Sequence, residues 1–332
     1  MRLPASLSAT STSTDQVHIV AEYASAALHC LPFMIRRKLF HLKLPARELF
    51  LGERTLIMGV LNVTPDSFSD GSKFFSVKAA VEAALAMQRA GADILDIGGE
   101  STRPGSAGIS VPEELARLLP VLEALRGRLK IPVSVDTRKA GVAELAIRAG
   151  AEMINDVSGL QHDPNLALAA ARSRVPLILM HMRGTPETMQ KLPFARDVLR
   201  DVMAGLRQSI SIARRAGVPK SQIVLDPGIG FGKSYDQNYE LLAELPTLAK
   251  LGYPLLVGTS RKGFLGATLA RGGKPAPPNQ RIWGTAATVT ASILKGAHIV
   301  RVHDVPEMLQ VARVSDALLA APGSRRTRQA AL

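Results

Sequence analysis

Polar side chains recur at one kind of position in this sequence, at or just after the end of a short apolar run. Asp136, Asn155 and Asp226 stand at the ends of three such runs, and Lys262 follows another. A carboxylate accepts two N–H bonds side by side, an amide donates and accepts, and a lysine donates to a carbonyl. The set therefore suits a flat heterocycle with adjacent N–H, NH₂ and C=O groups. Each Asp or Asn could instead cap the helix that follows.

A second group of residues is suited to phosphate. Arg301 and His303 are two positions apart, which places their side chains on the same side of an extended strand. Both types bind phosphate, although a satisfied surface pair is the alternative. Asn62 follows the first run and is a neutral oxygen ligand of the kind that Mg²⁺ accepts beside substrate phosphates. We therefore expect an anion site with Mg²⁺ as cofactor, whereas His181 alone is predicted to be structural.

Two Gly-rich stretches resemble nucleotide or metal loops only in part. Residues 228–234 end like a P-loop, but Pro227 stands where the first loop glycine belongs, so ATP binding is not expected. Residues 66–71 resemble part of a calcium loop, but Val77 stands where the closing Glu belongs. Neither stretch therefore predicts its ligand.

The apolar runs and the segments between them predict the elements that position these residues. Eight runs occur, at 56–61, 94–97, 132–135, 153–154, 176–180, 223–225, 255–257 and 299–302. Amphipathic helical patterns lie between them, at 78–90, 112–127, 139–149, 196–217, 239–252, 281–296 and 306–319. Glycines stand where helix C-caps belong, at positions 91, 150, 217, 252 and 296.

Alternating strands and helices of this kind fit a single (β/α)₈ TIM barrel or a doubly wound sheet. Because polar residues follow nearly every run, and only a barrel brings all eight strand ends to one mouth, we favour the barrel. We expect it to span residues 51–322. Residues 1–50 are predicted to be a poorly structured or weakly helical N-terminal extension, and residues 323–332 a basic tail.

Composition limits the class of protein. The chain has 332 residues, 46% of them apolar and 4% aromatic, which suits an α/β interior. One cysteine cannot form an internal disulfide, and no stretch has the length and apolarity of a membrane span. A secretory signal pattern is also missing. We therefore expect a cytoplasmic enzyme that does not bind a membrane.

The formal net charge of +13 raises the question of nucleic-acid binding. Residues 1–50 and the tail after Gly323 carry part of this charge, and the body has no aromatic-interleaved basic stripe and no zinc-finger spacing. A small anionic substrate is the expected partner, and nucleic acid is not.

From residue 51 to residue 319 the sequence resembles the dihydropteroate synthase family. Eight blocks in the order of the family carry the resemblance: 57–71 (IMGVLNVTPDSFSDG), 96–105 (DIGGESTRPG), 134–138 (SVDTR), 154–159 (INDVSG), 180–186 (MHMRGTP), 225–233 (LDPGIGFGK), 258–266 (GTSRKGFLG) and 301–305 (RVHDV). The resemblance implies a reaction of the folate pathway. In it, p-aminobenzoate is joined to 6-hydroxymethyl-7,8-dihydropterin diphosphate, giving 7,8-dihydropteroate and pyrophosphate.

The resemblance also implies roles for residues of this chain. The pterin and diphosphate would be bound by Asp96, Thr102, Asp136, Asn155, Met180, Asp226, Lys262, Arg301 and His303, with Mg²⁺ on Asn62. Asp136, Lys262, Arg301 and His303 would be catalytic. The aminobenzoate side would be lined by Pro65, Phe68, Thr102, Arg103, Phe231 and Ser260.

In the family, the diphosphate is thought to leave first, and the resulting cation on the exocyclic carbon is captured by the arylamine. The loops at 63–75 and 102–110 are expected to close over it. Two alternatives remain: the pterin-binding barrel of corrinoid-dependent methyltransferases, and a catalytically silent pterin-binding paralogue. The family is dimeric and is a sulfonamide target, and small residues in 281–296 allow close helix packing, so we expect a homodimer. Deletion of residues 1–48 is expected to leave fold and activity intact.

Overall fold

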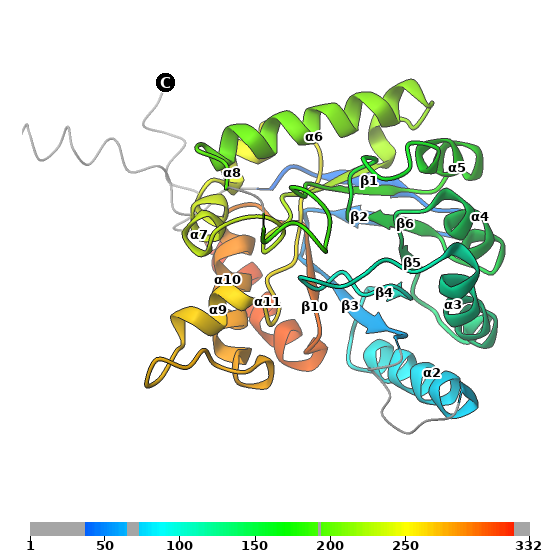
Figure 1. The fold of residues 1–332 in the computed structure, drawn as a ribbon, viewed down its shortest axis with the longest axis horizontal. Helices are drawn as coiled ribbons and strands as arrows, with labels where there is room; N and C mark the ends of the chain where they lie inside the picture. The colour runs from blue at the N-terminus through cyan, green and yellow to red at the C-terminus, as the bar shows by residue number, and fades with distance from the viewer. Residues whose placement is uncertain (1–36, 65–72, 192–193, 322–332) are drawn as a thin grey trace, which may run out of the picture.

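The computed structural model describes residues 37–64, 73–191 and 194–321. At its centre is a sheet of eight strands, surrounded by helices (Figure 1). The strands are β3 (Leu56–Asn62), β4 (Ile94–Gly98), β5 (Val133–Asp136), β6 (Met153–Asp156), β7 (Leu177–Met180), β8 (Ile223–Asp226), β9 (Leu256–Val257) and β10 (Ile299–Val302). Each of the eight predicted apolar runs forms one of these strands.

The strand order shows a closed barrel. Neighbours run β8-β7-β6-β5-β4-β3-β10-β9, and the seven pairings are all parallel. A parallel bridge between Leu225 and Leu255 joins β8 to the segment that leads into β9 and so closes the ring. The predicted TIM barrel is therefore confirmed over the doubly wound sheet. Closure matters for function because it directs every strand's carboxyl end to one mouth.

The helices form the outer layer. They are α2 (Lys73–Arg89), α3 (Val111–Leu125), α4 (Ala140–Arg148), α5 (Leu166–Ser173), α6 (Val198–Arg215), α7 (Tyr235–Ala243), α8 (Leu245–Ala249), α9 (Gly263–Thr268), α10 (Ile282–Leu294) and α11 (Val305–Ala320). The glycines predicted as C-caps all have positive φ, between 79° and 113°. α5 and α9 are not among the predicted helical segments. In the described part of the chain, no helix is long and apolar enough to span a membrane.

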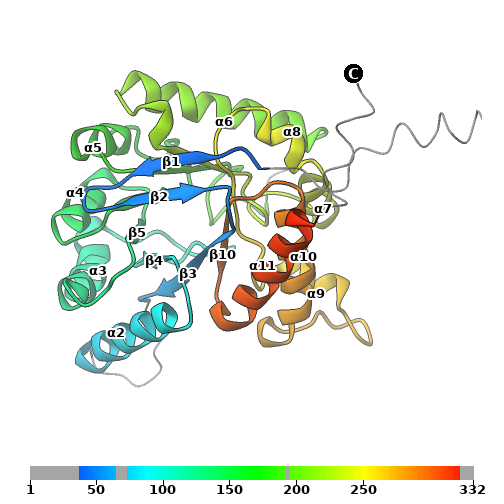
Figure 2. The same cartoon turned by 180° about the vertical axis from the view of Figure 1, so that it is seen from behind.

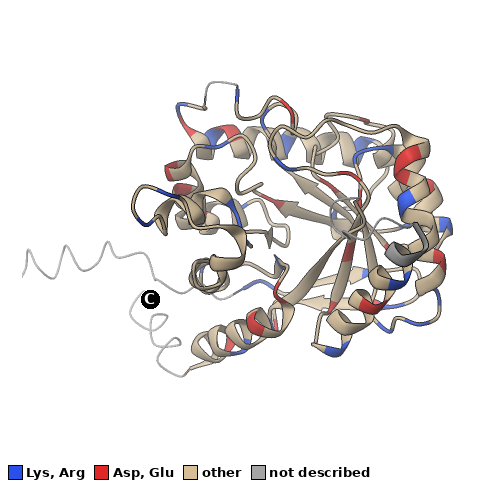
Figure 3. Cartoon of the chain, turned by 60° about the horizontal axis from the view of Figure 1, so that its bottom comes forward, with Lys and Arg blue, Asp and Glu red and all other residues tan. Residues whose placement is uncertain are grey.

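Charged residues of both signs are interspersed around the barrel in the view of Figure 3. On α6, for example, Asp201 in the first turn is followed by Arg214 and Arg215 in the last turn, which matches the direction of the helix dipole.

The structure changes the expected boundary of the barrel. A hairpin, β1 (Phe40–Lys43) paired with β2 (Glu48–Leu51), begins inside the segment predicted to be a poorly structured extension. It lies across the barrel strands, as Figure 2 shows. Leu42, Leu44 and Leu51 are buried against side chains from the first residues of the barrel strands, among them Leu56 and Ile94.

Polar contacts hold the same segment in place. Gln222 Nε2 donates to the Lys43 carbonyl over 2.7 Å, and the His298 Nε2 lies 3.0 Å from the Lys38 carbonyl oxygen. The hairpin therefore closes the amino-terminal end of the barrel, and deletion of residues 1–48 would open it. The sequence prediction missed the hairpin because each strand has only four residues, too few for a convincing alternation.

We expect Leu42→Ala to lower the free energy of unfolding by about 2–4 kcal/mol, because it leaves a cavity in the hairpin's apolar contact with the barrel. The matched control is Leu39→Ala, since Leu39 precedes the same hairpin and is 61% exposed. That variant should stay within about 0.5 kcal/mol of the wild type in urea unfolding. Equal losses in the two variants would contradict the role given to the hairpin.

Candidate functional site

Acidic and amide side chains from neighbouring strands meet at the carboxyl-terminal mouth of the barrel. Asp136 ends β5 and is paired in register with Asn155 of β6 and Gly98 of β4. Asp226 ends β8 and pairs in register with Met180 of β7. The structure thus brings together the residues that the sequence predicted to act as a set.

Arg301 of β10 joins two of these carboxylates across the barrel. Its Nε donates to Asp96 Oδ2 over 2.7 Å, and its Nη2 donates to Asp136 Oδ2 over 2.8 Å. Asn155 Nδ2 donates to the same Asp96 oxygen over 3.0 Å. Asp96 is fully buried, and its second oxygen has no hydrogen-bond partner within the described residues. One guanidinium therefore compensates two buried acids.

Asp226 and Lys262 form the other half of the mouth. Asp226 Oδ1 accepts the Gly228 N–H over 2.7 Å. The Lys262 ammonium lies 3.9 Å from the centre of the Phe231 ring, a cation–π contact. Gly230 has a φ of +84°, and a Cβ atom there would lie 3.0 Å from Lys262 Cδ. The glycine-rich turn after β8 therefore packs closely against the Lys262 side chain.

Burial disfavours the charged forms of the side chains at this mouth. It raises the pKa of Asp226 to about 6, against the opposing effect of the Gly228 N–H and Lys262. It also raises the pKa of Asp136, although Arg301 opposes this, and it lowers the pKa of Lys262 to about 8. Perturbed titratable groups clustered in one place are typical of functional sites. A ligand with complementary hydrogen-bonding groups would relieve this strain.

His303 follows β10 and Ser260 follows β9 at the same mouth. The His303 Nδ1 is 3.0 Å from Ser260 Oγ, and the backbone N–H of His303 donates to the same oxygen. Burial, followed by the nearby Arg301, lowers the pKa of His303 to about 3, so the imidazole is neutral at pH 7. It can therefore donate a hydrogen bond to an anion, whereas the positive charge there comes from Arg301.

Thr102 and Arg103 lie in the loop after β4, above a buried ionic network that the sequence analysis missed. Glu100 pairs with Arg138 at 2.6 Å and with Lys139 at 2.5 Å, and Lys139 also pairs with Glu114 at 2.5 Å. The two cations lower the pKa of Glu100 against the effect of burial. A Cβ atom on Gly108 would lie 3.0 Å from Arg138 Nη2, so the loop packs directly on this network.

The remaining predicted site residues have different outcomes. Asn62 ends β3 and is half-buried at the mouth. Met180 is buried in a small apolar cluster with Val157, Met189 and Phe231. Pro65 and Phe68, and with them most of the predicted lid at 63–75, lie outside the described residues. Among the described residues no group of three or more His, Cys, Asp or Glu side chains could hold a metal ion.

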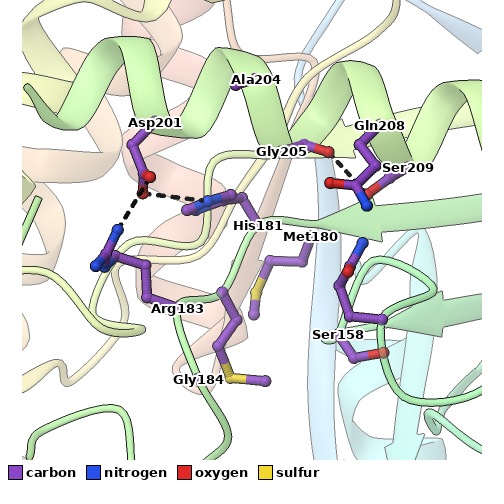
Figure 4. A pocket seen from close by; sticks show the side chains of 12 residues that line it. Ser158, Met180, His181, Arg183, Gly184, Asp201, Ala204, Gly205, Gln208 and Ser209 are labelled. Carbon is purple, nitrogen blue, oxygen red and sulfur yellow. Dashed lines mark hydrogen bonds and ion pairs between the residues drawn. The ribbon is translucent and has the colours of Figure 1, made fainter. Parts of the chain in front are cut away.

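A cavity of about 470 Å³ lies beside this mouth, between α6 and the loops that follow β6 and β7. In Figure 4, Asp201 of α6 lies between Arg183 and the ring of His181. A Cβ atom on Gly205 of α6 would lie 2.4 Å from His181 Cδ2, so the ring packs on the helix backbone. His181 is 9% exposed and holds structural contacts, as the sequence suggested.

The comparisons with known proteins agree with this geometry. Residues 58–303 match the sequence model of the family described as pterin binding enzyme. The dihydropteroate synthase of Synechocystis sp. is 49% identical over 267 residues, which cover 80% of this chain and 91% of that protein. That of Bacillus subtilis is 48% identical, with 80% and 90% covered.

Solved structures give the same result. Xanthomonas albilineans dihydropteroate synthase with 4-aminobenzoic acid is 44% identical with a TM-score of 0.79, covering 86% of this chain and all of that one. The same enzyme in complex with 7,8-dihydropteroate has a TM-score of 0.76 at 42% identity, covering 85% of this chain and all of that one. Fold and site thus define a pterin-binding TIM barrel. More narrowly, the chain belongs to the dihydropteroate synthase family.

We expect Asp226→Asn to stabilise the unliganded protein at pH 8 by about 2–3 kcal/mol. The folded protein holds the Asp226 proton up to about pH 6, whereas the unfolded chain loses it near pH 3.8, so rising pH across this window destabilises the wild type. Asparagine keeps an acceptor for the Gly228 N–H and does not ionise, so the variant loses no stability across this pH window. Chemical unfolding at pH 4 and pH 8 measures this, and the difference should vanish at pH 4. A variant less stable than wild type at pH 8 would contradict the strain described above.

Proposed function

We propose that this chain is a dihydropteroate synthase, which condenses 6-hydroxymethyl-7,8-dihydropterin diphosphate with p-aminobenzoate to give 7,8-dihydropteroate and pyrophosphate. The single observation that carries the proposal is the polar set at the barrel mouth, in which buried Asp136, Asn155 and Asp226 lie with half-buried Lys262 and Arg301. It offers paired acceptors, an amide and two cations within one ring of strand ends. Relatives at 45–49% identity bear the name of this activity, which supports the same conclusion.

The pterin is the substrate that this set suits. The Asp226 carboxylate accepts the ring N–H and the amino group side by side, and Lys262 donates to the ring carbonyl. Asn155 supplies an amide that can both donate and accept a hydrogen bond. Arg301 lies over the face of the ring, and Met180 and Asp96 line the base of the site. Asp96 retains an oxygen without a partner in the described residues, so an N–H group of the ligand has an acceptor there.

Departure of the diphosphate creates a cation on the exocyclic carbon of the pterin. Arg301 and the neutral His303 stabilise the leaving oxygens, and Asp136 opposes the positive charge that spreads over the ring. Asp136 can do so only when ionised, which its 2.8 Å bond from Arg301 favours. Each of these groups therefore acts on charge that appears during the reaction.

Mg²⁺ fits this site as a companion of the substrate. Asn62 is a single neutral oxygen ligand, and Mg²⁺ is commonly held by one or two protein ligands together with substrate phosphates. When bound, the ion supplies positive charge to the diphosphate oxygens. The dependence of pyrophosphate release on added Mg²⁺ tests this assignment.

The aminobenzoate side of the site lies toward the loops after β4, β8 and β9. Thr102, Arg103, Phe231 and Ser260 are assigned to it, and the sequence resemblance adds Pro65 and Phe68, which lie outside the described residues. The cation must be kept from water until the weakly basic arylamine arrives, which is the task of loops that close over the mouth. The ionic network under residues 101–110 gives one of these loops a fixed base.

The protein is proposed to be a cytoplasmic homodimer without a nucleic-acid partner. Apolar side chains stand exposed near α10 and α11, with Trp283 80% and Val314 64% exposed. Ala286, Ala287 and Ala291 of α10 allow a second helix to approach closely. Sedimentation as a single chain at micromolar concentration would contradict the dimer.

We expect Asp226→Asn to lower kcat/KM by two to three orders of magnitude. Asparagine turns one acceptor toward a donor of the pterin, so one charge-assisted bond is lost and one buried polar group is left unpaired, about 3–5 kcal/mol together. The matched control is Asp197→Asn, since Asp197 is an exposed N-cap that accepts the Arg200 N–H over 2.9 Å. It should keep activity within a few-fold. Steady-state kinetics on both variants measures the difference, and near-normal turnover by Asp226→Asn would overturn the pterin assignment.

A further inference from the structure

Lys233 is a buried cation that none of the proposed substrate contacts uses. Its side chain follows the glycine-rich turn after β8, and the residue is only 2% exposed. The ammonium lies 2.8 Å from the His181 carbonyl oxygen, 2.9 Å from the Gly228 carbonyl oxygen and 3.0 Å from His181 Nδ1. It thus has three acceptors for its three protons. Its role is therefore toward the protein and not toward a phosphate.

These contacts tie the end of β7 to the turn that follows Asp226 at the end of β8. The His181 N–H donates to the Asp226 carbonyl over 3.0 Å, and the Gly228 N–H donates to the Asp226 carboxylate over 2.7 Å. Gly228 has a φ of +69°, and a Cβ atom there would lie only 1.9 Å from the His181 carbonyl oxygen. Lys233 therefore closes a ring of contacts through Gly228 and His181 around Asp226.

The cycle of contacts through Lys233, Gly228 and His181 requires a neutral His181 imidazole with an unprotonated Nδ1. Burial, followed by the charges of Lys233 and Arg183, lowers the pKa of His181 to about 2, so the ring is neutral. Nδ1 can accept from Lys233 only if the proton is on Nε2, which lies 3.5 Å from Asp201 Oδ2. Asp201 and Gly205 of α6 hold this ring on its other side, as Figure 4 shows for Asp201.

We infer that Lys233 is a positioning residue for the synthase reaction: it holds the β8 turn so that the Asp226 carboxylate faces the pterin, and its charge adds to that of Lys262 in favouring the ionised carboxylate. The inference rests on the proposed function, because it takes Asp226 as the pterin acceptor. The charged groups facing Lys233 are Asp226 of β8, Asp201 of α6, Lys262 after β9 and Arg183 after β7.

The pH range in which Lys233 acts follows from the two groups. Burial lowers the pKa of Lys233 to about 7, and burial raises the pKa of Asp226 to about 6. Near pH 6 the lysine is thus mostly protonated and favours the ionised carboxylate. Without this charge Asp226 takes up its proton at higher pH, and a protonated carboxyl cannot accept two N–H bonds from the pterin.

The experiment compares Lys233→Met and Lys233→Gln with wild type. Affinity for 6-hydroxymethylpterin is measured by calorimetry from pH 5.5 to 8, together with the KM of each substrate. In both variants we expect the acid limb of pterin affinity to move up by about 0.5–1 pH unit. The KM for the pterin diphosphate should rise about tenfold, and the KM for aminobenzoate should change less than about twofold.

The matched control is Ser209→Ala. Ser209 is buried in α6 and donates to the Gly159 carbonyl over 2.7 Å, and it makes no hydrogen bond to Lys233, Gly228 or Asp226 among the described residues. It should lower the melting temperature without moving the acid limb. An acid limb that stays at the wild-type pH in the Lys233 variants would overturn the inference. If Lys233→Met does not fold, Lys233→Gln decides, since its amide can still donate to the carbonyls. Failure of wild type to bind the pterin would instead overturn the proposed function.

Discussion

The burial of charge at one end of the barrel is the constraint on which the rest of the structure depends. Arg301 alone bonds to both Asp96 and Asp136, and Asp226 and Lys262 lie in the same mouth. Buried ion pairs are weak sources of stability, because desolvation opposes their attraction. The folded chain keeps these groups at a free-energy penalty, and a complementary ligand removes part of it. The same buried charged groups therefore lower the stability of the protein without ligand and contribute to its affinity for the ligand.

The apolar parts of the fold offset that strain. The strands are buried on both faces, and the β1–β2 hairpin covers the amino-terminal end of the barrel with Leu42, Leu44 and Leu51. Stability is thus concentrated away from the mouth, which leaves the strand ends free to carry polar groups. Two networks extend this support to the mouth itself. Glu100, Arg138, Lys139 and Glu114 lie under one loop, and Lys233 and His181 hold another.

The sequence predicted the barrel well because its signal is local. Each apolar run, such as 223–225, is recognised from a few consecutive residues. A closed barrel then brings the polar residues at the ends of these runs to one mouth. The supporting contacts could not be read in this way, because their partners are far apart in the chain. Lys139 and Glu114, or Lys233 and His181, are 25 and 52 positions apart. The sequence showed only that Lys233 belongs to an incomplete P-loop pattern, whereas in the structure its ammonium donates to the His181 and Gly228 carbonyls.

The central claim is that this mouth binds a dihydropterin and releases its diphosphate to an arylamine. The most direct measurement is a reaction of the full chain with the pterin diphosphate and Mg²⁺, with and without p-aminobenzoate, in which pyrophosphate and dihydropteroate are both quantified. We predict that dihydropteroate forms only with aminobenzoate and in a one-to-one ratio with pyrophosphate. A well-folded protein that binds the pterin but forms no aminobenzoate-dependent product would contradict the account and identify a silent binder.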